Sequence, residues 1–228
     1  MRALRAIAAM AVACAPSRMP PSHERAAIAC GAGLTAASRA TPRGLEAWCE
    51  DERGVRTGPF ERQFPRGQLA ERGRYAAGAL DGDYESFYAS GAPHERGRYA
   101  RGRRDGAWRA WHENGKPWLE VTYAAGQPAG PWLEHDYAGD IMFEGTYRDG
   151  RLEGEWRGFR AGDIVRRGAS RGGKLDGTVL VTHPDGSRTE EHYRNNRRHG
   201  EQTYYDQDGK LAQHADYVDG IEQGSNAP

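Results

Sequence analysis

The sequence has almost no lysine, very little cysteine and no net charge. Its 228 residues include 32 basic and 32 acidic side chains, and lysine occurs only at positions 116, 174 and 210. Arginine therefore supplies nearly all of the positive charge. The basic stretches RGRRDG (101–106) and RNNRRHG (194–200) both fall where turns are expected. Because nucleic-acid binding needs a concentrated basic face, we expect no nucleic-acid partner.

Catalytic and metal-binding motifs are also missing. The sequence contains no Gly-x-Ser-x-Gly, no HExxH and no phosphate-binding glycine loop. His112 and His183 occupy matching repeat positions but lie about four strands apart. That separation is roughly 19 Å at the usual interstrand spacing, which is too far to share a metal. His192 and His199 are joined by a tight turn, and we interpret them as a surface pair. We therefore expect no enzyme, no cofactor and no metal site.

No segment shows a sustained 3.6-residue apolar period, so we expect almost no helix after the N-terminus. The chain instead has glycines at a fixed spacing. A Gly-x-aromatic motif recurs four times at steps of 24 residues, and two weaker copies follow at steps of 23. A fixed period in the range of about 20–50 residues is typical of repeat proteins. The seven copies begin at Gly58, Gly82, Gly106, Gly130, Gly154, Gly177 and Gly200.

Each copy reads as two strands and two turns. In copy three, AWRAWH and PWLEVTY are rich in aromatic and β-branched residues, as strands are. Between them lies ENG, which suits a tight hairpin turn whose two central residues both have positive φ. The second turn has the form x-Gly-x-x-x-Gly, as in AAGQPAG. Because the connections are short and the period is constant, we predict an all-β fold: an elongated antiparallel meander of about seven β-hairpin repeats in one twisted layer, with a period of about 24 residues.

Most of the aromatic rings are predicted to be structural. A tyrosine lies seven residues before the next Gly-x-aromatic motif in most copies, and the residue two before it is often glycine, as at Gly73, Gly97 and Gly145. A missing side chain leaves room for a ring from the neighbouring strand. A ladder of such rings would give a thin sheet its core. The predicted structural aromatics are Phe60, Tyr75, Tyr84, Tyr99, Trp108, Tyr123, Trp132, Tyr147 and Trp156.

The pattern Gly-x-Trp-x-x-Trp-x-x-x-Gly followed by Tyr-x-x-Gly, with its copies from Gly58 to about Gly224, resembles the MORN-repeat variant of bacterial proteins. Proteins of that family are often labelled YwqK-type antitoxins. The resemblance implies an elongated β-hairpin array with a non-catalytic, antitoxin-like binding role. The chain departs from the pattern at Ser170, Val179 and Gln202, which replace aromatic residues, and two copies lose a residue. We expect copies five to seven to be less regular or specialised.

The first residues read as an export signal. MRALRAIAAMAVACAP has two arginines ahead of an apolar run at 6–13, which is too short to span a bilayer. The small residues before Cys14 resemble the lipobox of bacterial lipoproteins, with alanine where leucine is usual. We predict a signal peptide at 1–13, lipidation at Cys14 and a flexible tether at 14–29. Ordinary secretion and a start at a later methionine are the alternatives.

Cys30 and Cys49 form the remaining even pair of cysteines. In an oxidising compartment they can close a loop of about 20 residues, which contributes ~3 kcal/mol by loop-entropy reasoning. The stretch LEAWCE (45–50) reads as an extra strand ahead of the first repeat. We therefore predict a disulfide-closed N-terminal cap at 30–57, followed by the repeat array at 58–228. A redox or metal role has no support because no CxxC is present.

These features predict an exported, non-catalytic repeat module of the bacterial cell envelope, in the periplasm or at the outer membrane. It would contact the membrane only through a lipid on Cys14; secretion is the alternative location. The expected partner is another protein of unknown identity. A cell-wall or glycan-binding array and a purely structural envelope spacer remain open. The candidate binding surface comprises Arg62, Phe87, Arg109, Trp111, Arg157 and Phe159.

Overall fold

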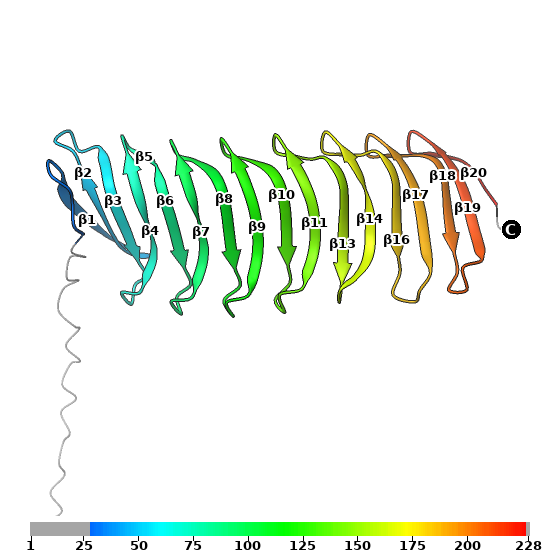
Figure 1. Cartoon of the computed structure of the whole chain (residues 1–228), viewed down its shortest axis with the longest axis horizontal. Helices are drawn as coiled ribbons and strands as arrows, with labels where there is room; N and C mark the ends of the chain where they lie inside the picture. The colour runs from blue at the N-terminus through cyan, green and yellow to red at the C-terminus, as the bar shows by residue number, and fades with distance from the viewer. Residues whose placement is uncertain (1–27, 227–228) are drawn as a thin grey trace, which may run out of the picture.

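The computed structural model describes residues 28–226. The predicted signal peptide at 1–13, the lipidation site Cys14 and the tether as far as residue 27 lie outside the described residues. The described part contains one antiparallel sheet of 20 strands and no helix. Figure 1 shows the strands side by side in chain order along the long axis of the molecule.

Three of the strands are two-residue segments. β5, β12 and β15 each pair with the strand before them, and β6, β13 and β16 then continue against that same strand after an irregularity. The strands are β1 (Thr35–Thr41), β2 (Gly44–Glu50), β3 (Arg56–Gln63), β4 (Leu69–Ala76), β5 (Ala79–Leu80), β6 (Gly82–Phe87), β7 (Pro93–Ala100), β8 (Arg103–Trp111), β9 (Pro117–Ala124), β10 (Gln127–His135), β11 (Ile141–Arg148), β12 (Arg151–Leu152), β13 (Gly154–Arg160), β14 (Asp163–Arg171), β15 (Lys174–Leu175), β16 (Gly177–Thr182), β17 (Arg188–Arg194), β18 (Arg197–Tyr205), β19 (Leu211–Val218) and β20 (Ile221–Asn226).

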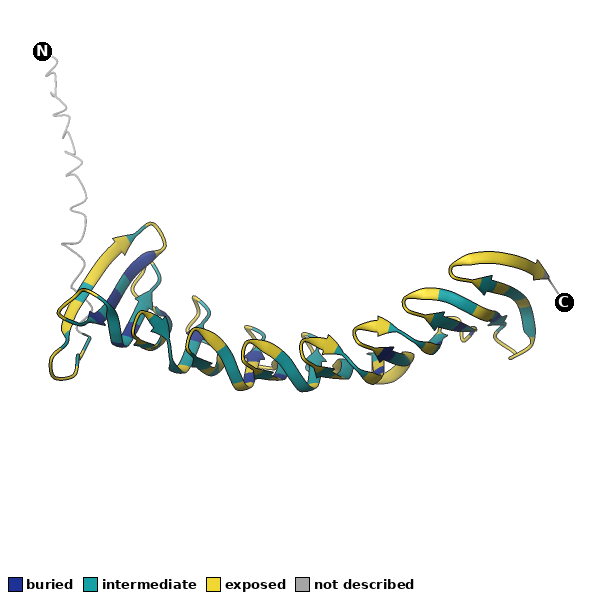
Figure 2. Ribbon diagram, turned by 90° about the horizontal axis from the view of Figure 1, so that it is seen from above, coloured by how far each residue is buried: buried dark blue, intermediate teal, exposed yellow. Residues whose placement is uncertain are grey.

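This architecture confirms the predicted all-β meander. Successive hairpins pair only with their neighbours, so the sheet stays open, with β1 and β20 as its two edge strands. Seen from above, the sheet is bowed, and both of its ends bend toward the same side (Figure 2). The prediction of an elongated single layer rather than a closed barrel is therefore correct.

One face of the sheet, which we call the aromatic face, carries the predicted structural rings. Trp108 is 2% exposed, and its ring centroid lies 5.9 Å from that of Tyr84 and 5.1 Å from that of Tyr99. A Cβ added to Gly97 would come within 2.2 Å of the Trp108 ring. The glycine therefore makes the room for the neighbouring ring that the sequence pattern predicts. Similar contacts join Phe60 to Tyr75 at 4.9 Å and Trp132 to Tyr147 at 4.9 Å.

Polar side chains replace the rings of the aromatic face near the C-terminal end. Glu191 stands where copies one, two, four and five have glycine, and Gln202 is its register partner on β18. The Glu191 carboxylate accepts hydrogen bonds from the Tyr193 hydroxyl at 3.0 Å, from Arg198 at 3.0 Å and from the Gln202 amide at 3.3 Å. Loss of the aromatic ring in copy seven thus coincides with gain of a carboxylate that occupies the space beside it.

The tight two-residue turn lies at the second turn of each copy, and the prediction that placed it at the first turn is wrong for every copy except the fifth. Arg101 and Gly102 have φ of 49° and 77°, and the flanking Ala100 and Arg103 are register partners. In the first turn of copy two, Gly91 alone has positive φ, and the Tyr88 N–H donates to the Ala92 carbonyl at 2.8 Å. The first loop is longer because one residue in the left-handed region closes a type I turn with a bulge.

The two missing residues of copies five and six have different structural consequences. In copy five the first turn shortens to Ala161 and Gly162, which both have positive φ, between the partners Arg160 and Asp163. In copy six the pairing of β16 with β17 runs without the register shift found at this point in the other copies. Each deletion removes one local irregularity and leaves the sheet continuous.

The second turn joins each copy to its neighbour, and in copies two to four the first turn does so as well. At the second turn the Gly102 N–H donates to the Leu80 carbonyl at 2.7 Å, and the Gly126 N–H donates to the Arg104 carbonyl at 2.8 Å. At the first turn the Tyr88 hydroxyl donates to the Trp111 carbonyl at 2.8 Å. These bonds span 22 or 23 residues of sequence, so hairpins two to four are connected at both edges of the sheet as well as along their strands.

The segment ahead of the first copy adds one more hairpin to the sheet. β1 pairs with β2 and β2 pairs with β3. Cys30 and Cys49 form a disulfide with a Cα–Cα distance of 5.7 Å, and Cys49 is fully buried. The predicted extra strand at 45–50 lies within β2, whereas no feature of the sequence indicated β1. The disulfide ties the residues that precede β1 to the strand next to the repeat array.

Candidate functional site

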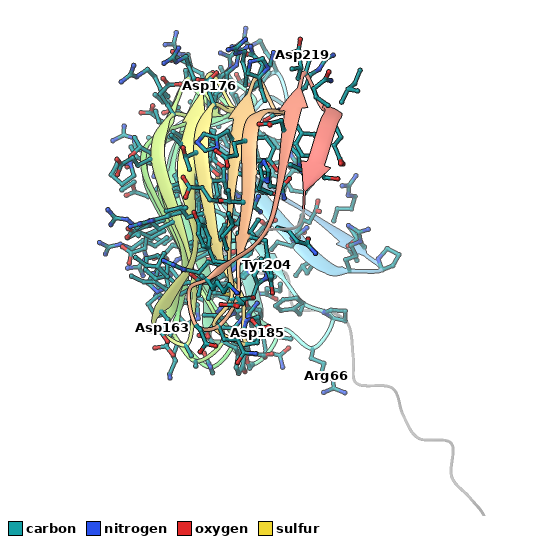
Figure 3. The ribbon with its side chains drawn as sticks, turned by 90° about the vertical axis from the view of Figure 1, so that its right-hand side faces the viewer. Arg66, Asp163, Asp176, Asp185, Tyr204 and Asp219 are labelled. Atoms are coloured by element: carbon teal, nitrogen blue, oxygen red, sulfur yellow. A yellow bond between two sulfur atoms is a disulfide. The ribbon has the colours of Figure 1, made fainter. Side chains whose placement is uncertain are left out.

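The face opposite the aromatic face, which we call the ladder face, carries a continuous row of cross-strand partners. Register partners point to the same side of a sheet. Figure 3 looks along the array and shows side chains standing on both sides of the single layer, with Asp163 and Asp185 at one edge and Asp176 and Asp219 at the other. The row comprises Glu61, Arg72, Glu85, Arg96, Arg109, Glu120, Leu133, Glu144, Arg157, Arg167, Leu180, Glu190, Thr203 and His214.

We call this row of partners, from Glu61 to His214, the charge row. Opposite charges alternate along its first part. Glu85 lies 2.5 Å from Arg72 and 2.6 Å from Arg96, so that one carboxylate joins two guanidinium groups. Burial alone would raise the pKa of Glu85, but hydrogen bonds and charge from Arg72 and Arg96 outweigh it and hold the pKa below its ordinary value. Exposed ion pairs contribute only about 0–1 kcal/mol each. Their main effect here is to fix the direction of the arginine side chains.

Two junctions in the charge row place arginine directly opposite arginine. Arg96 is the register partner of Arg109, and Arg157 is the register partner of Arg167. Like charges directly opposite each other destabilise a sheet. Arg157 has Glu144 at 2.8 Å on its other side, whereas Arg167 has no ion pair with any residue between 28 and 226. The second junction therefore presents an uncompensated guanidinium to solvent.

An apolar stripe runs beside the charge row on the same face, two residues away on the strands that carry its rings and three residues away on their partner strands, where the register shifts. From copy two to copy five it contains an aromatic or imidazole ring in every copy, and each ring has a proline or isoleucine as its register partner. Ile141 and Ile164 are 37% and 41% exposed. Copy six interrupts the stripe with Thr182 and Arg188. The pairs are Phe87–Pro93, Trp111–Pro117, His135–Ile141 and Phe159–Ile164.

The row on the other side of the charge row consists of short side chains in copies three and four, and Glu155 and His192 join it in copies five and six. It includes Ala107, Thr122, Pro131, Thr146, Ala169 and Thr178. Three hollows of about 280, 260 and 300 Å³ follow one another from β10 to β18. Neighbouring hollows share lining residues: Arg157 lines the first two, and Arg167 and Leu180 line the last two. The groove that these hollows form thus runs across the strands. Its first two hollows lie on this side of the charge row, and the third, lined by Ile164, Thr182 and Arg188, lies on the side of the apolar stripe.

The structure places five of the six predicted binding residues on the ladder face. Arg109 and Arg157 belong to the charge row, and the three aromatic residues belong to the apolar stripe. Arg62 lies on the aromatic face instead, because it is the register partner of Glu71 and binds that carboxylate at 2.9 Å. Its position in the repeat is one residue out of phase with Arg109, and one residue along a strand reverses the face. The residues on the ladder face are Phe87, Arg109, Trp111, Arg157 and Phe159.

Several residues of this surface were not predicted. Arg167, Arg188 and Ile164 line the hollow of about 300 Å³. A signal for Arg167 is present in the sequence, because the incoming strands carry a charged or histidine residue at the same repeat position from Arg72 to His214. Following that series with the 24- and 23-residue steps would have found it. The hollow itself has no sequence signal, since it depends on which neighbouring side chains are short.

A second group of rings lies at the first-turn edge of the sheet. The ring centroid of Trp118 is 6.3 Å from that of His94 and 6.2 Å from that of His112, and the His112 ring is 5.3 Å from Tyr137. Trp118 is 40% exposed and Tyr137 is 61% exposed. These rings lie beside first turns, apart from the charge row, so they form a separate exposed cluster.

The geometry offers no centre for a bound metal. Between residues 28 and 226, no group of three or more histidine, cysteine, aspartate or glutamate side chains is arranged to hold an ion. His192 approaches Glu190 at 4.0 Å and His199 approaches Asp219 at 3.4 Å, each as an isolated pair. The same residues include no helix with the length and hydrophobicity that crossing a membrane requires.

Comparison with known proteins identifies the repeat. Residues 104–125 and 198–219 each match the family model described as the MORN repeat variant. The two segments occupy equivalent positions in the array, from the start of β8 to the turn after β9 and from β18 to the turn after β19. No curated protein sequence matches the chain. The chain therefore carries MORN-type repeats, as its motif spacing predicts.

Proposed function

We propose that this MORN-repeat chain is an exported, non-catalytic scaffold that binds another protein along its ladder face. The observation that carries the proposal is the apolar stripe, which runs for four consecutive copies beside a charge row that contributes arginine in copies two, three and five. Arginine and tryptophan are enriched among the residues that dominate binding energy at protein interfaces. Polar residues around an apolar centre are the usual arrangement of such interfaces.

The repeat type supports a non-enzymatic role, because MORN repeats often serve as protein- or membrane-binding modules. The Cys30–Cys49 disulfide indicates an oxidising environment, where disulfides persist. Export through the predicted signal peptide, anchoring through Cys14 in the bacterial envelope and the antitoxin-like role belong to the proposal and rest on the sequence patterns alone. The proposed partner is a protein, and nucleic acid is not expected.

Glycan binding is the second candidate function. It is favoured by the first-turn cluster, where Trp118 and Tyr137 are exposed beside His112. Exposed aromatic rings give a flat apolar surface on which a sugar ring can stack. The two candidates use different surfaces, so substitutions can separate them.

The test uses the oxidised chain as bait for an extract of bacterial envelopes, with bound protein and bound carbohydrate measured in parallel. Two substitutions alter the ladder face, Trp111→Ser and Arg167→Glu. The matched control is Trp118→Ser, which removes an exposed tryptophan from the first-turn cluster. The carbonyl of Trp111 that accepts the Tyr88 hydrogen bond is backbone, so Trp111→Ser leaves that contact between copies in place. Thermal unfolding of each variant checks that the array remains folded.

One protein captured in near-equal amount by the wild type and by Trp118→Ser, and lost with both ladder-face variants, is the expected result. Carbohydrate captured without protein and lost with Trp118→Ser would replace this proposal with the glycan-binding function. A folded wild type that captures neither would leave a structural spacer as the function of the array.

A further inference from the structure

We propose that the segment bound by the ladder face is proline-rich and adopts the polyproline II conformation, with an apolar residue at every third position and one carboxylate opposite copy five. This inference rests on the proposed protein-binding function and names the kind of partner. Four features carry it: the spacing of the ring-and-partner pairs of the apolar stripe, the chemistry of those pairs, the arginine donors beside them in copies two, three and five, and the uncompensated Arg167.

The spacing of the stripe fits a three-residue turn. Each copy contributes two strands, so the ring-and-partner pairs of the stripe recur every ~9.6 Å. We call the space between successive pairs a notch. A polyproline II helix repeats every three residues, or about 9.3 Å. An α-helix presents the same side after seven residues, or about 10.5 Å, and would be out of register by roughly 3 Å after three steps. An extended strand reaches a similar length after three residues, at ~10 Å, but its side chain then points to the opposite face.

The chemistry of the notches is also that of polyproline recognition. Three copies of the apolar stripe place an aromatic ring beside a proline or isoleucine, and these pairs flank the notches. The pairs are Phe87–Pro93, Trp111–Pro117 and Phe159–Ile164. Proline-rich ligands bind in grooves between aromatic side chains, and their preformed conformation limits the entropy lost on binding. His135 supplies the ring in copy four.

The charge row supplies hydrogen-bond donors beside the stripe. A polyproline II helix makes no internal hydrogen bonds, so its carbonyl groups are free to accept them. Arg109 stands two residues from Trp111 and Arg96 three residues from Pro93 on their strands, and the two arginine side chains are 66% and 64% exposed. An α-helix has already satisfied most of its own carbonyls and would leave these donors unused.

The position of the carboxylate follows from the second arginine junction. Arg157 already binds Glu144 at 2.8 Å, whereas its register partner Arg167 has no ion pair in the described chain. A carboxylate on the ligand at this point would lie between the two guanidinium groups and offset their repulsion. Thr182 and Arg188 end the apolar stripe in copy six. The footprint therefore covers copies two to five, which corresponds to about 12 ligand residues at three per copy.

The test is a display library of random 16-residue peptides, selected on the immobilised, oxidised chain and counter-selected on Trp111→Ser. We expect the retained peptides to be rich in proline, with apolar residues spaced by three and a single aspartate or glutamate. The best peptide should bind Arg167→Glu at least tenfold more weakly than wild type. Replacing its acidic residue with lysine should restore binding to Arg167→Glu. Trp118→Ser should bind as wild type does.

Apolar spacing of three and four, as in a helix, or of two, as in a strand, would overturn the inference. Equal binding of the acidic peptide to wild type and Arg167→Glu would overturn the placement of the carboxylate. Capture of an envelope protein that depends on Trp111 and Arg167, together with peptides of another spacing, would reject the polyproline partner and keep the protein-binding function. Failure of that capture as well would reject both.

Discussion

The indole ring of Trp108 lies across Gly97 on the preceding strand, where an added Cβ would come within 2.2 Å of the ring. Gly97 has no positive φ, so the requirement is for space alone. We expect Gly97→Ala to lower the free energy of unfolding by about 1–3 kcal/mol, the range for overpacking a close contact. Gly158→Ala is the control, because its nearest neighbour would be 3.7 Å away. Urea unfolding measures both, and equal stability of the two variants would contradict a ring-over-glycine core.

Reduction of the Cys30–Cys49 bond should destabilise only one end of the molecule. The loop closed by the disulfide has a sequence separation of 19 residues, and opening it should cost ~3 kcal/mol by loop entropy. Because each hairpin contacts mainly its neighbours, the loss should be confined to β1, β2 and β3. Hydrogen exchange of oxidised and reduced protein measures the effect by segment. Faster exchange of similar size in β9 and β17 would show that the array unfolds as one cooperative unit instead.

The ion pairs of Glu85 should make stability depend on acid pH. Its pKa in the folded protein is lowered from an ordinary value of 4.5 by Arg72 and Arg96, against the effect of burial. The unfolded chain therefore binds the proton more readily. The stabilising contribution is present above about pH 4.5 and is lost as the pH falls through the folded pKa. We expect the difference in stability between wild type and Glu85→Gln to shrink from about pH 6 to about pH 3. Glu201→Gln, which removes a carboxylate without an ion pair in the described residues, should show no comparable trend.

Glu191 and Gln202 should tolerate replacement by the glycine and the aromatic ring of other copies only when both residues are changed together. Glu191→Gly alone removes the partner of Arg198 and leaves a gap, and Gln202→Trp alone places a ring against a carboxylate. Together they recreate the ring-and-glycine pair of Trp108 and Gly97. We expect a favourable coupling of about 1 kcal/mol or more in a double-mutant cycle. Additive effects of the two changes would mean that the residues act independently.

The sequence predicts the strands and core of this fold because both follow from local chemistry repeated many times. A glycine two residues before a tyrosine leaves space in one copy, and its recurrence indicates the ring ladder that contains Trp108. The position of the tight turn could not be read in the same way. Asn-Gly and Arg-Gly both permit a residue with positive φ, and the pairing of Ala100 with Arg103 decides which turn has two such residues.

The candidate surface was predictable only in part. Trp111 and Arg109 belong to the period, and the structure puts them on one face. The phase of Arg62 was misjudged because three arginines near aromatic residues look equivalent until their register partners are known. The register of Arg62 with Glu71 assigns it to the other face. The groove beside Arg167 arises from short side chains on neighbouring strands, which are far apart in the sequence.

The hydrogen bonds that the second-turn glycines make to the preceding copy, such as that from Gly102 to Leu80, have a consequence for the size of the molecule. Each such bond is completed within two adjacent hairpins, so no contact depends on how many hairpins follow. Removing or duplicating a 24-residue unit would shorten or lengthen the array by about 9.6 Å and leave the remaining joints unchanged. The length of the array is therefore proportional to the number of its hairpins. That number sets the distance between molecules bound at its two ends.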